Sequence, residues 1–250
     1  MSDVLGRRPV GDPGHWLAGR VAVVTGASRG IGAATAEAVA ASGAHVILAA
    51  RDVDGIEATA SRIRQAGGQA TPVPADVSKS ADVERLFSAA RHQGPVTALV
   101  CGAGVLTSAP FAQTTPDIWD QTLAVNLTGA FLCCRAAFDD MLEAGQGRIV
   151  TIASLSGVYA TEKFPGLAAY NVSKYGVIGL TEAIAVEGRR HGISAICISP
   201  GAVDTDMLRR ANPALRPGLT PGDVGTLIVA LLDSPLAPAS GANIPLFSNT

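Results

Sequence analysis

Short apolar segments alternate along the chain with segments whose apolar residues recur at helical spacing. The apolar segments predict β-strands at residues 20–25, 45–50, 69–75, 96–101, 148–153 and 193–199. The segments between them predict helices at residues 31–41, 55–65, 79–91, 115–142 and 168–190. Strands that are apolar at successive positions are typical of a parallel sheet buried on both faces. The pattern therefore predicts an α/β fold, a doubly wound parallel sheet with helices on both faces, in which ligands bind beyond the carboxyl ends of the strands.

Local signals mark two helix starts. Thr115 followed by Pro116 supplies an N-cap residue and a first helical proline. Thr220 with Asp223 three residues later resembles a capping box and predicts a last helix.

Length and composition indicate one domain. The chain has 250 residues, of which 48% are hydrophobic and 28 are glycine, enough for a large core. The domain is expected to span residues 17–250. Residues 1–16 contain charges and prolines without an apolar run, so they predict a mobile extension and not a signal peptide. The last apolar run, residues 243–247, predicts an edge strand, because Pro245 removes a ladder hydrogen bond.

Charge and cysteine content exclude several classes of function. A net charge of -2 leaves no basic surface that could neutralise a phosphate backbone, so nucleic acid is not an expected partner. No apolar run is long enough to span a membrane, and a cytoplasmic location is expected. The four histidines have no metal-ligand spacing, so no metal is expected. The cysteines have neither CxxC nor metal-ligand spacing, so they are expected to be reduced and buried; they are Cys101, Cys133, Cys134 and Cys197.

A glycine-rich loop joins the first predicted strand to the first predicted helix. Gly26, Gly30 and Gly32 let the backbone turn tightly and approach a pyrophosphate at the positive end of the helix. The loop also contains Ser28, Arg29 and Ile31. An ordinary strand-to-helix turn remains the alternative, because glycine-rich turns are common.

Tyr170 and Lys174 lie four residues apart, so they share one face of a predicted helix. An ammonium group beside the phenol would lower the pKa of Tyr170 and suit it for proton exchange with an alcohol or carbonyl. The alternatives are that the tyrosine only packs, that the lysine lies on a solvated face, and that Ser154 caps a strand end.

From about residue 17 to 247 the chain resembles the short-chain dehydrogenase/reductase family, which implies a Rossmann-like fold. The Gly-x3-Gly-x-Gly spacing, the Tyr-x3-Lys pair and four further motifs occur in the family's order. These four are Asp76-Val77, Gly102-Ala103-Gly104, Asn126 within Val125–Gly129, and Pro200-Gly201 followed by Val203 and Thr205. The resemblance implies that these motifs, with the glycine loop, Tyr170 and Lys174, bind a nicotinamide dinucleotide.

The resemblance also implies a catalytic tetrad. Tyr170 would donate the proton in reduction, Lys174 would hold the nicotinamide ribose, Ser154 would hydrogen-bond the substrate oxygen, and Asn126 would hold a water that relays protons. Ser156 is the alternative serine, because it lies closer to Tyr170 in the sequence.

Charge favours NADPH over NADH. The end of the second strand, where an NAD-specific site has an acidic residue, carries Arg51, and the glycine loop carries Arg29. Two guanidinium groups can bind a 2′-phosphate by charge-assisted hydrogen bonds. Asp52 is the competing signal, since its carboxylate could bind a ribose hydroxyl instead.

The sequence therefore predicts an NADPH-dependent carbonyl reductase, similar in its motifs to 3-oxoacyl-thioester reductases. The alternatives are an NAD-dependent alcohol or polyol dehydrogenase and a dinucleotide-binding regulatory protein without catalysis. The resemblance also implies a homo-oligomer, a dimer or tetramer, built on the long helices.

Departures from the family are Cys101-Gly102 in place of an Asn-Asn pair and a short segment at residues 205–220, which predicts an open pocket. Its expected apolar walls are Leu106, Phe164, Met207 and Leu208.

Overall fold

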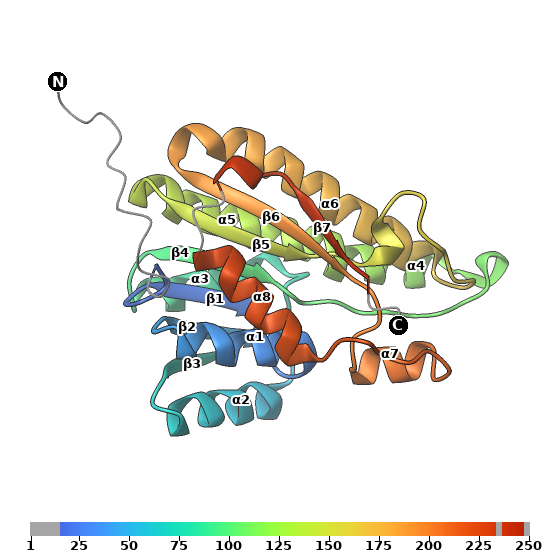
Figure 1. Ribbon diagram of the computed structural model, residues 1–250, viewed down its shortest axis with the longest axis horizontal. Helices are drawn as coiled ribbons and strands as arrows, with labels where there is room; N and C mark the ends of the chain where they lie inside the picture. The colour runs from blue at the N-terminus through green and yellow to red at the C-terminus, as the bar shows by residue number, and fades with distance from the viewer. Residues whose placement is uncertain (1–15, 234–236, 248–250) are drawn as a thin grey trace.

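A single parallel sheet of seven strands forms the centre of the protein in the computed structural model, which describes residues 16–233 and 237–247 (Figure 1). The strand order is β3-β2-β1-β4-β5-β6-β7. The strands are β1 (Val21–Thr25), β2 (His45–Ala50), β3 (Gln69–Pro74), β4 (Val96–Cys101), β5 (Gly147–Ile152), β6 (Ile193–Pro200) and β7 (Asn243–Leu246). Every neighbouring pair is parallel, which confirms the predicted doubly wound α/β fold.

Helices cover both faces of the sheet because successive side chains of each strand point to opposite sides. In β1, Val21 and Val23 join the apolar cluster on one face, and Ala22 and Val24 join the cluster on the other. The first face packs against α3 (Ser80–Arg91), α5 (Gly129–Ala144) and α6 (Ala168–Gly188). The second packs against α1 (Gly30–Ala41), α2 (Val53–Gln65) and α8 (Pro221–Asp233). Helix α4 (Pro116–Leu123) precedes α5 and contacts α6.

The predicted helix starts are confirmed. The Thr115 hydroxyl accepts a hydrogen bond from the Ile118 amide at 3.3 Å. Thr220 and Asp223 form the reciprocal bonds of a capping box, at 2.8 and 3.2 Å. The edge position of β7 is also confirmed, with Pro245 in register with Ser199 on one side.

Two elements differ from the sequence-based expectation. The helix expected over residues 115–142 is interrupted by a π-helical turn, Ala124–Thr128, between α4 and α5. A short helix, α7 (Asp206–Ala211), lies in the segment expected only to be short, and Thr205 caps it. The capping hydroxyl accepts from the Leu208 amide at 3.2 Å.

The first described residue already belongs to the folded domain. The ring of Trp16 lies between two guanidinium groups, 4.2 Å from that of Arg20 and 4.0 Å from that of Arg148. Burial lowers the pKa of Arg148 to about 10. Of the extension predicted at residues 1–16, residues 1–15 lie outside the described residues, and Trp16 packs against the domain.

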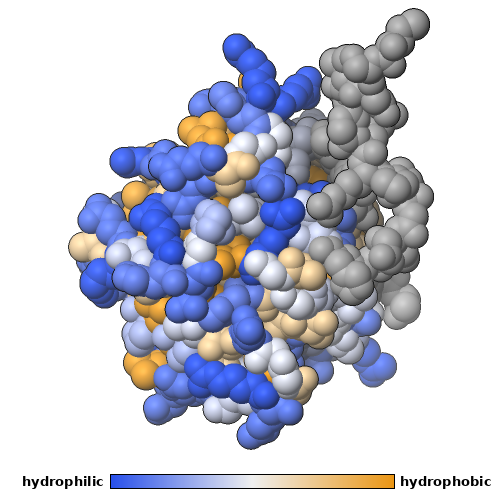
Figure 2. Space-filling model, turned by 90° about the vertical axis from the view of Figure 1, so that its left-hand side faces the viewer, coloured by the Kyte–Doolittle hydropathy of each residue, from blue (hydrophilic) through white to orange (hydrophobic). Residues whose placement is uncertain are grey.

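The face in Figure 2 is mainly hydrophilic, with small separate apolar areas. None of the helices in the described ranges is long and apolar enough to cross a membrane.

Candidate active site

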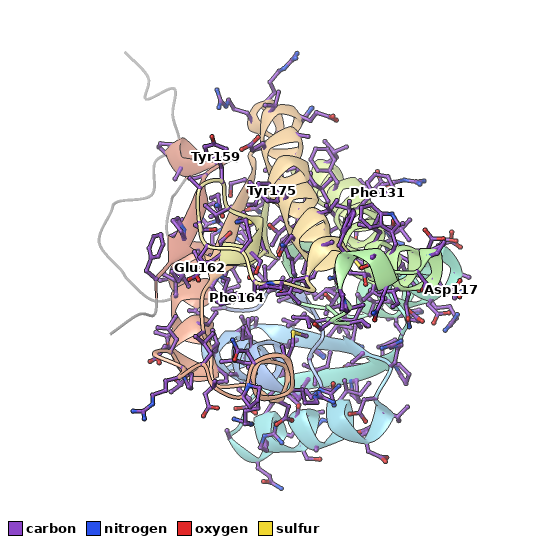
Figure 3. The ribbon with its side chains drawn as sticks, turned by 90° about the vertical axis from the view of Figure 1, so that its right-hand side faces the viewer. Asp117, Phe131, Tyr159, Glu162, Phe164 and Tyr175 are labelled. Atoms are coloured by element: carbon purple, nitrogen blue, oxygen red, sulfur yellow. The ribbon has the colours of Figure 1, made fainter. Side chains whose placement is uncertain are left out.

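A cleft of about 1220 Å³ opens at the carboxyl ends of the strands, the edge that faces the viewer in Figure 3. Strand order reverses between β1 and β4, and in a doubly wound sheet this reversal creates the ligand-binding crevice. All the residues predicted to bind a cofactor line the cleft. They are Gly26, Ser28, Arg29, Gly30, Ile31, Gly32, Arg51, Asp76, Val77, Gly102, Ala103, Gly104, Tyr170, Lys174, Pro200, Gly201, Val203 and Thr205.

The glycine loop has no room for side chains. Gly26 has φ of +72°, and a Cβ atom there would lie 2.7 Å from the carbonyl carbon of Gly102. A Cβ atom on Gly32 would overlap the carbonyl oxygen of Gly26. Helix α1 follows directly, with no side-chain cap on its N-terminus and no acidic residue in its first turn. The exposed amides and the glycine surface fit the pyrophosphate of a dinucleotide.

A threonine that the sequence reasoning missed braces the neighbouring turn. The Thr25 hydroxyl, at the end of β1, accepts hydrogen bonds from the amides of Gly102 at 3.1 Å and Ala103 at 3.2 Å. These bonds connect the glycine loop to the end of β4, where the sequence has Cys101-Gly102. No sequence motif marks this role, because it depends on β1 and β4 being neighbours in the sheet.

Two charged residues at the end of β2, Arg51 and Asp52, differ in their contacts. The Asp52 carboxylate caps α2 by accepting a hydrogen bond from the Gly55 amide at 3.1 Å. Arg51 is exposed at the cleft and forms no ion pair with a described residue. Arg29 also lines the cleft, and its charge contributes to the lowered pKa of Asp206 in α7, although Arg209 is the main cause.

Tyr170 and Lys174 lie on the buried side of α6, where 9% and 6% of their surfaces are exposed. The Lys174 ammonium donates to the carbonyl of Ile152 at 2.8 Å and lies 5.6 Å from the centre of the Tyr170 ring. Burial lowers the pKa of Lys174 to about 8. Burial also raises the pKa of Tyr170, and a hydrogen bond with Ser154 opposes the rise.

The expected lowering of the Tyr170 pKa by Lys174 is therefore wrong for this structure. The spacing of the two residues correctly predicts a shared helix face, but it contains no information on burial. Loss of hydration disfavours the phenolate more than the hydrogen bond favours it.

Ser154 forms the hydrogen bond that opposes the rise in the pKa of Tyr170. Ser154 lies just after β5 and caps the 3₁₀ turn Leu155–Gly157. Its hydroxyl oxygen accepts from the Ser156 amide at 3.2 Å, which leaves its proton available to a second acceptor. Ser156 also lines the cleft.

Asn126 lies behind the cleft, in the π-helical turn, with 2% of its surface exposed. Its amide accepts from the Val105 amide at 2.8 Å and donates to the Val105 carbonyl at 2.9 Å. It also donates to the Ser173 hydroxyl at 3.0 Å, and Ser173 in turn donates to the carbonyl of Tyr170 at 2.7 Å. Asn126 thus connects the wall of the cleft to the backbone that carries Tyr170. Ser173 is a second site residue that the sequence reasoning missed.

The structure also bears on the expected cysteines, pocket walls and metal ligands. The four cysteines are free and buried, as predicted. Leu106, Phe164, Met207 and Leu208 all line the cleft, as expected of pocket walls. Within residues 16–233 and 237–247, no three His, Cys, Asp or Glu side chains gather as metal ligands would.

A doubly wound sheet with a glycine-lined crevice, in which Ser154 lies beside the buried Tyr170 and Lys174, is typical of a dinucleotide-binding oxidoreductase. Residues 20–216 match the family model described as short chain dehydrogenase. The chain belongs to this family, the short-chain dehydrogenases/reductases.

Named relatives differ in their substrates. The chain is 39% identical over 196 residues to the D-threitol dehydrogenase of Mycolicibacterium smegmatis, covering 78% of this chain and 74% of that protein. It is 36% identical over 198 residues to the 3-oxoacyl-[acyl-carrier-protein] reductase of a Synechocystis species, covering 78% and 79%. It is also 36% identical over 230 residues to the glycine betaine reductase ATRR of Emericella nidulans, covering 88% of this chain but only 18% of that protein.

A solved structure provides a close structural match. A putative NAD(P) dependent gluconate 5-dehydrogenase from Beutenbergia cavernae, with bound NADP at low occupancy, superposes with a TM-score of 0.84 at 35% identity. The match covers 93% of this chain and 96% of that one.

Proposed function

We propose that the protein reduces a ketone or aldehyde carbonyl to an alcohol with NADPH, and that Tyr170 donates the proton. The observation that carries the proposal is the hydrogen bond between Ser154 and the buried Tyr170 beside Lys174, in a cleft that also contains the glycine loop. The reduced nicotinamide ring of bound NADPH supplies the hydride.

The side chains of the site bind the substrate oxygen, donate the proton and stabilise the charge that develops. The Ser154 hydroxyl donates to the carbonyl oxygen of the substrate and holds it beside the phenol as negative charge develops. Tyr170 transfers its proton to that oxygen, and Lys174 binds the ribose hydroxyls and stabilises the phenolate that forms. Burial disfavours the phenolate of Tyr170, so the phenol carries the proton that it donates. Asn126 holds the backbone of Tyr170 through Ser173 and serves the proton relay to Lys174.

Replacing Tyr170 with phenylalanine tests the proton donor. The variant should lose about 10²- to 10⁴-fold in kcat, the usual contribution of a general acid. The measurement is NADPH oxidation with a panel of diacetyl, benzaldehyde, dihydroxyacetone and ethyl acetoacetate. NADPH affinity, followed by fluorescence, should stay within about 2-fold, because the ring remains in place. Full activity in the variant would refute the role of Tyr170.

The preference for NADPH is supported by the free Arg51 and by Asp52, whose carboxylate is occupied in capping α2. The related structure from Beutenbergia cavernae, described as containing bound NADP at low occupancy, is consistent with this preference. Arg51→Ala should weaken NADPH binding by about 10-fold or more and leave NADH binding within about 2-fold. Arg85→Ala is the matched control, since Arg85 pairs with Asp82 on α3. Equal losses for both cofactors, or faster turnover with NADH, would reject the preference.

Polyol oxidation is the second candidate, and the resemblance to D-threitol dehydrogenase and to a putative gluconate dehydrogenase favours it. Rates of NAD⁺ and NADP⁺ reduction with threitol and gluconate, compared with the carbonyl panel at the same pH, distinguish the two directions. Tight NADPH binding without turnover of either panel would instead support a regulatory protein.

We place the activity in the cytoplasm, where the four free cysteines would stay reduced.

We also propose that two or four copies associate through α5 and α6. Phe131 lies on α5 in Figure 3, and 45% of its surface is exposed. Val172 and Val186 on α6 are exposed as well, at 44% and 71%. Light scattering after size exclusion would give the number of copies, and a monomer at micromolar concentration would reject the proposal.

A further inference from the structure

The segment at residues 158–166, between the 3₁₀ turn and α6, forms one wall of the cleft. Its residues Tyr159, Glu162 and Phe164 line the cleft, and Figure 3 shows them on the loop beside the first turns of α6. The segment contains neither helix nor strand, so side-chain contacts must determine its conformation.

Lys163 forms the central contact of this segment. Its ammonium donates to the carbonyl of Val158 at 2.6 Å, to the hydroxyl of Thr161 at 2.7 Å and to the carbonyl of Leu155 at 3.3 Å. Hydrogen bonds from a charged donor are stronger than neutral ones. The charge is therefore directed into the loop and not toward a ligand.

Two more side chains contact the same carbonyls. The Thr161 hydroxyl lies 2.6 Å from the Leu155 oxygen and 2.9 Å from the Val158 oxygen. The Tyr175 hydroxyl, on α6, donates to the Val158 carbonyl at 3.1 Å, and the Lys163 ammonium lies 5.2 Å from the Tyr175 ring. We call Lys163, Thr161 and Tyr175 the loop clamp.

The clamped carbonyls belong to the first residue of the 3₁₀ turn that Ser154 caps and to the residue after that turn. Leu155 directly follows Ser154, and Val158 directly follows the turn. The Gly157 amide donates to the carbonyl of Ser154 at 2.8 Å, and a Cβ atom on Gly157 would lie only 2.5 Å from the carbonyl carbon of Lys174. The turn therefore packs directly on the backbone of α6, and a shift of the turn would move Ser154 relative to Tyr170.

We propose that Lys163 is a positioning residue that fixes the hydroxyl of Ser154 for the reaction. It acts by binding the carbonyls of Leu155, the first residue of the 3₁₀ turn, and of Val158, the residue after the turn, and it does not touch the reacting atoms. The inference rests on the proposed reduction, because it assigns Lys163 a part in that same site. Neither the glycine loop nor the Tyr-x3-Lys pair indicates this role.

A double-mutant cycle tests the coupling between Lys163 and Ser154. The variants are Lys163→Met, Ser154→Ala and the double substitution, assayed with NADPH and the compound of the carbonyl panel that the wild type reduces fastest. Lys163→Met should lower kcat about 10-fold in the wild type but at most about 2-fold when Ser154 is already alanine, because coupled residues are not additive. NADPH affinity should stay within about 2-fold in all variants. Lys163→Arg should retain most of the rate, and Lys79→Met, a change at an exposed lysine of the α3 N-cap, should have no effect.

Equal losses in both backgrounds, or no loss in the wild type, would overturn the proposal. Absence of turnover in the wild type would reject the proposed function instead. In that case amide hydrogen exchange still tests whether Lys163 holds the turn. Lys163→Met should speed exchange at Gly157 and Val158, because their amides donate hydrogen bonds within the turn. Unchanged exchange there would reject the clamp. If Lys163→Met does not fold, Thr161→Val removes one member of the clamp and is scored by the same cycle.

Discussion

Lys174 provides a test of the site that does not need a substrate. Its side chain is buried, with a single hydrogen bond to the Ile152 carbonyl and no carboxylate among the causes of its pKa shift. Burial penalises the ammonium, so folding costs free energy whenever the lysine is protonated. Replacing Lys174 with methionine removes this cost and keeps a side chain of similar length.

The size and sign of the effect follow from the pKa. A shift from 10.5 in the unfolded chain to about 8 in the folded protein corresponds to a penalty of about 3 kcal/mol at pH 7, where both states are protonated. Between the two pKa values the unfolded state binds more protons than the folded state, so stability rises with pH. By about pH 9.5 the penalty should have fallen by about 2 kcal/mol.

Urea unfolding of the cofactor-free protein at pH 7 and about pH 9.5 measures this change. The free energy of unfolding of the wild type, minus that of Lys174→Met, should rise by about 2 kcal/mol between the two conditions. The loss of the Ile152 hydrogen bond shifts both values equally and cancels in the comparison. Lys79→Met, at an exposed lysine, should show no such rise. A difference that is flat or falls with pH would refute the assignment of Lys174 as a buried, desolvated ammonium.

Two further predictions concern the glycine loop and the start of the domain. Gly32→Ala should destabilise the protein by about 1–3 kcal/mol and weaken NADPH binding at least about 10-fold, because its methyl group would overlap the Gly26 carbonyl. Gly179→Ala, with nothing within 4 Å of the added Cβ, is the control. Trp16→Ala should lower stability by about 1–2 kcal/mol by removing the ring between two arginine side chains, and thermal unfolding measures it. An unchanged Tm would show that the ring contributes nothing.

The sheet could be predicted from sequence because its strands are buried on both faces. The apolar runs at residues 45–50 and 96–101 predict two strands, and β2 and β4 have these bounds. A strand whose side chains are apolar on both sides can bury them only inside a sheet covered by helices on both faces. The helix starts at Thr115 and Thr220 were predictable for a different reason, because capping uses residues a few positions apart. Likewise, the predicted cofactor residues follow strand ends, and the parallel topology brings strand ends to one edge.

Features that depend on distant contacts could not be predicted. The π-helical turn places Asn126 against Val105, which is 21 residues away, and no local signal marks it. The six residues of α7 are too few for a periodic pattern. The loop clamp depends on Lys163 reaching backward to Leu155 and on Tyr175 reaching across from α6. The raised pKa of Tyr170 has the same origin, because burial is a property of the whole fold.

The two perturbed pKa values at the site are complementary in the reductive direction. Burial keeps the Tyr170 phenol neutral, so its proton is available for transfer at neutral pH. The same burial brings the pKa of Lys174 only down to about 8, so at pH 7 about nine in ten molecules retain the ammonium. When the phenol loses its proton to the substrate oxygen, the positive charge that stabilises the phenolate is already in place. Oxidation of an alcohol would use the same phenol and phenolate in reverse, so the charge on Lys174 serves both directions, and the comparison of carbonyl and polyol rates distinguishes them.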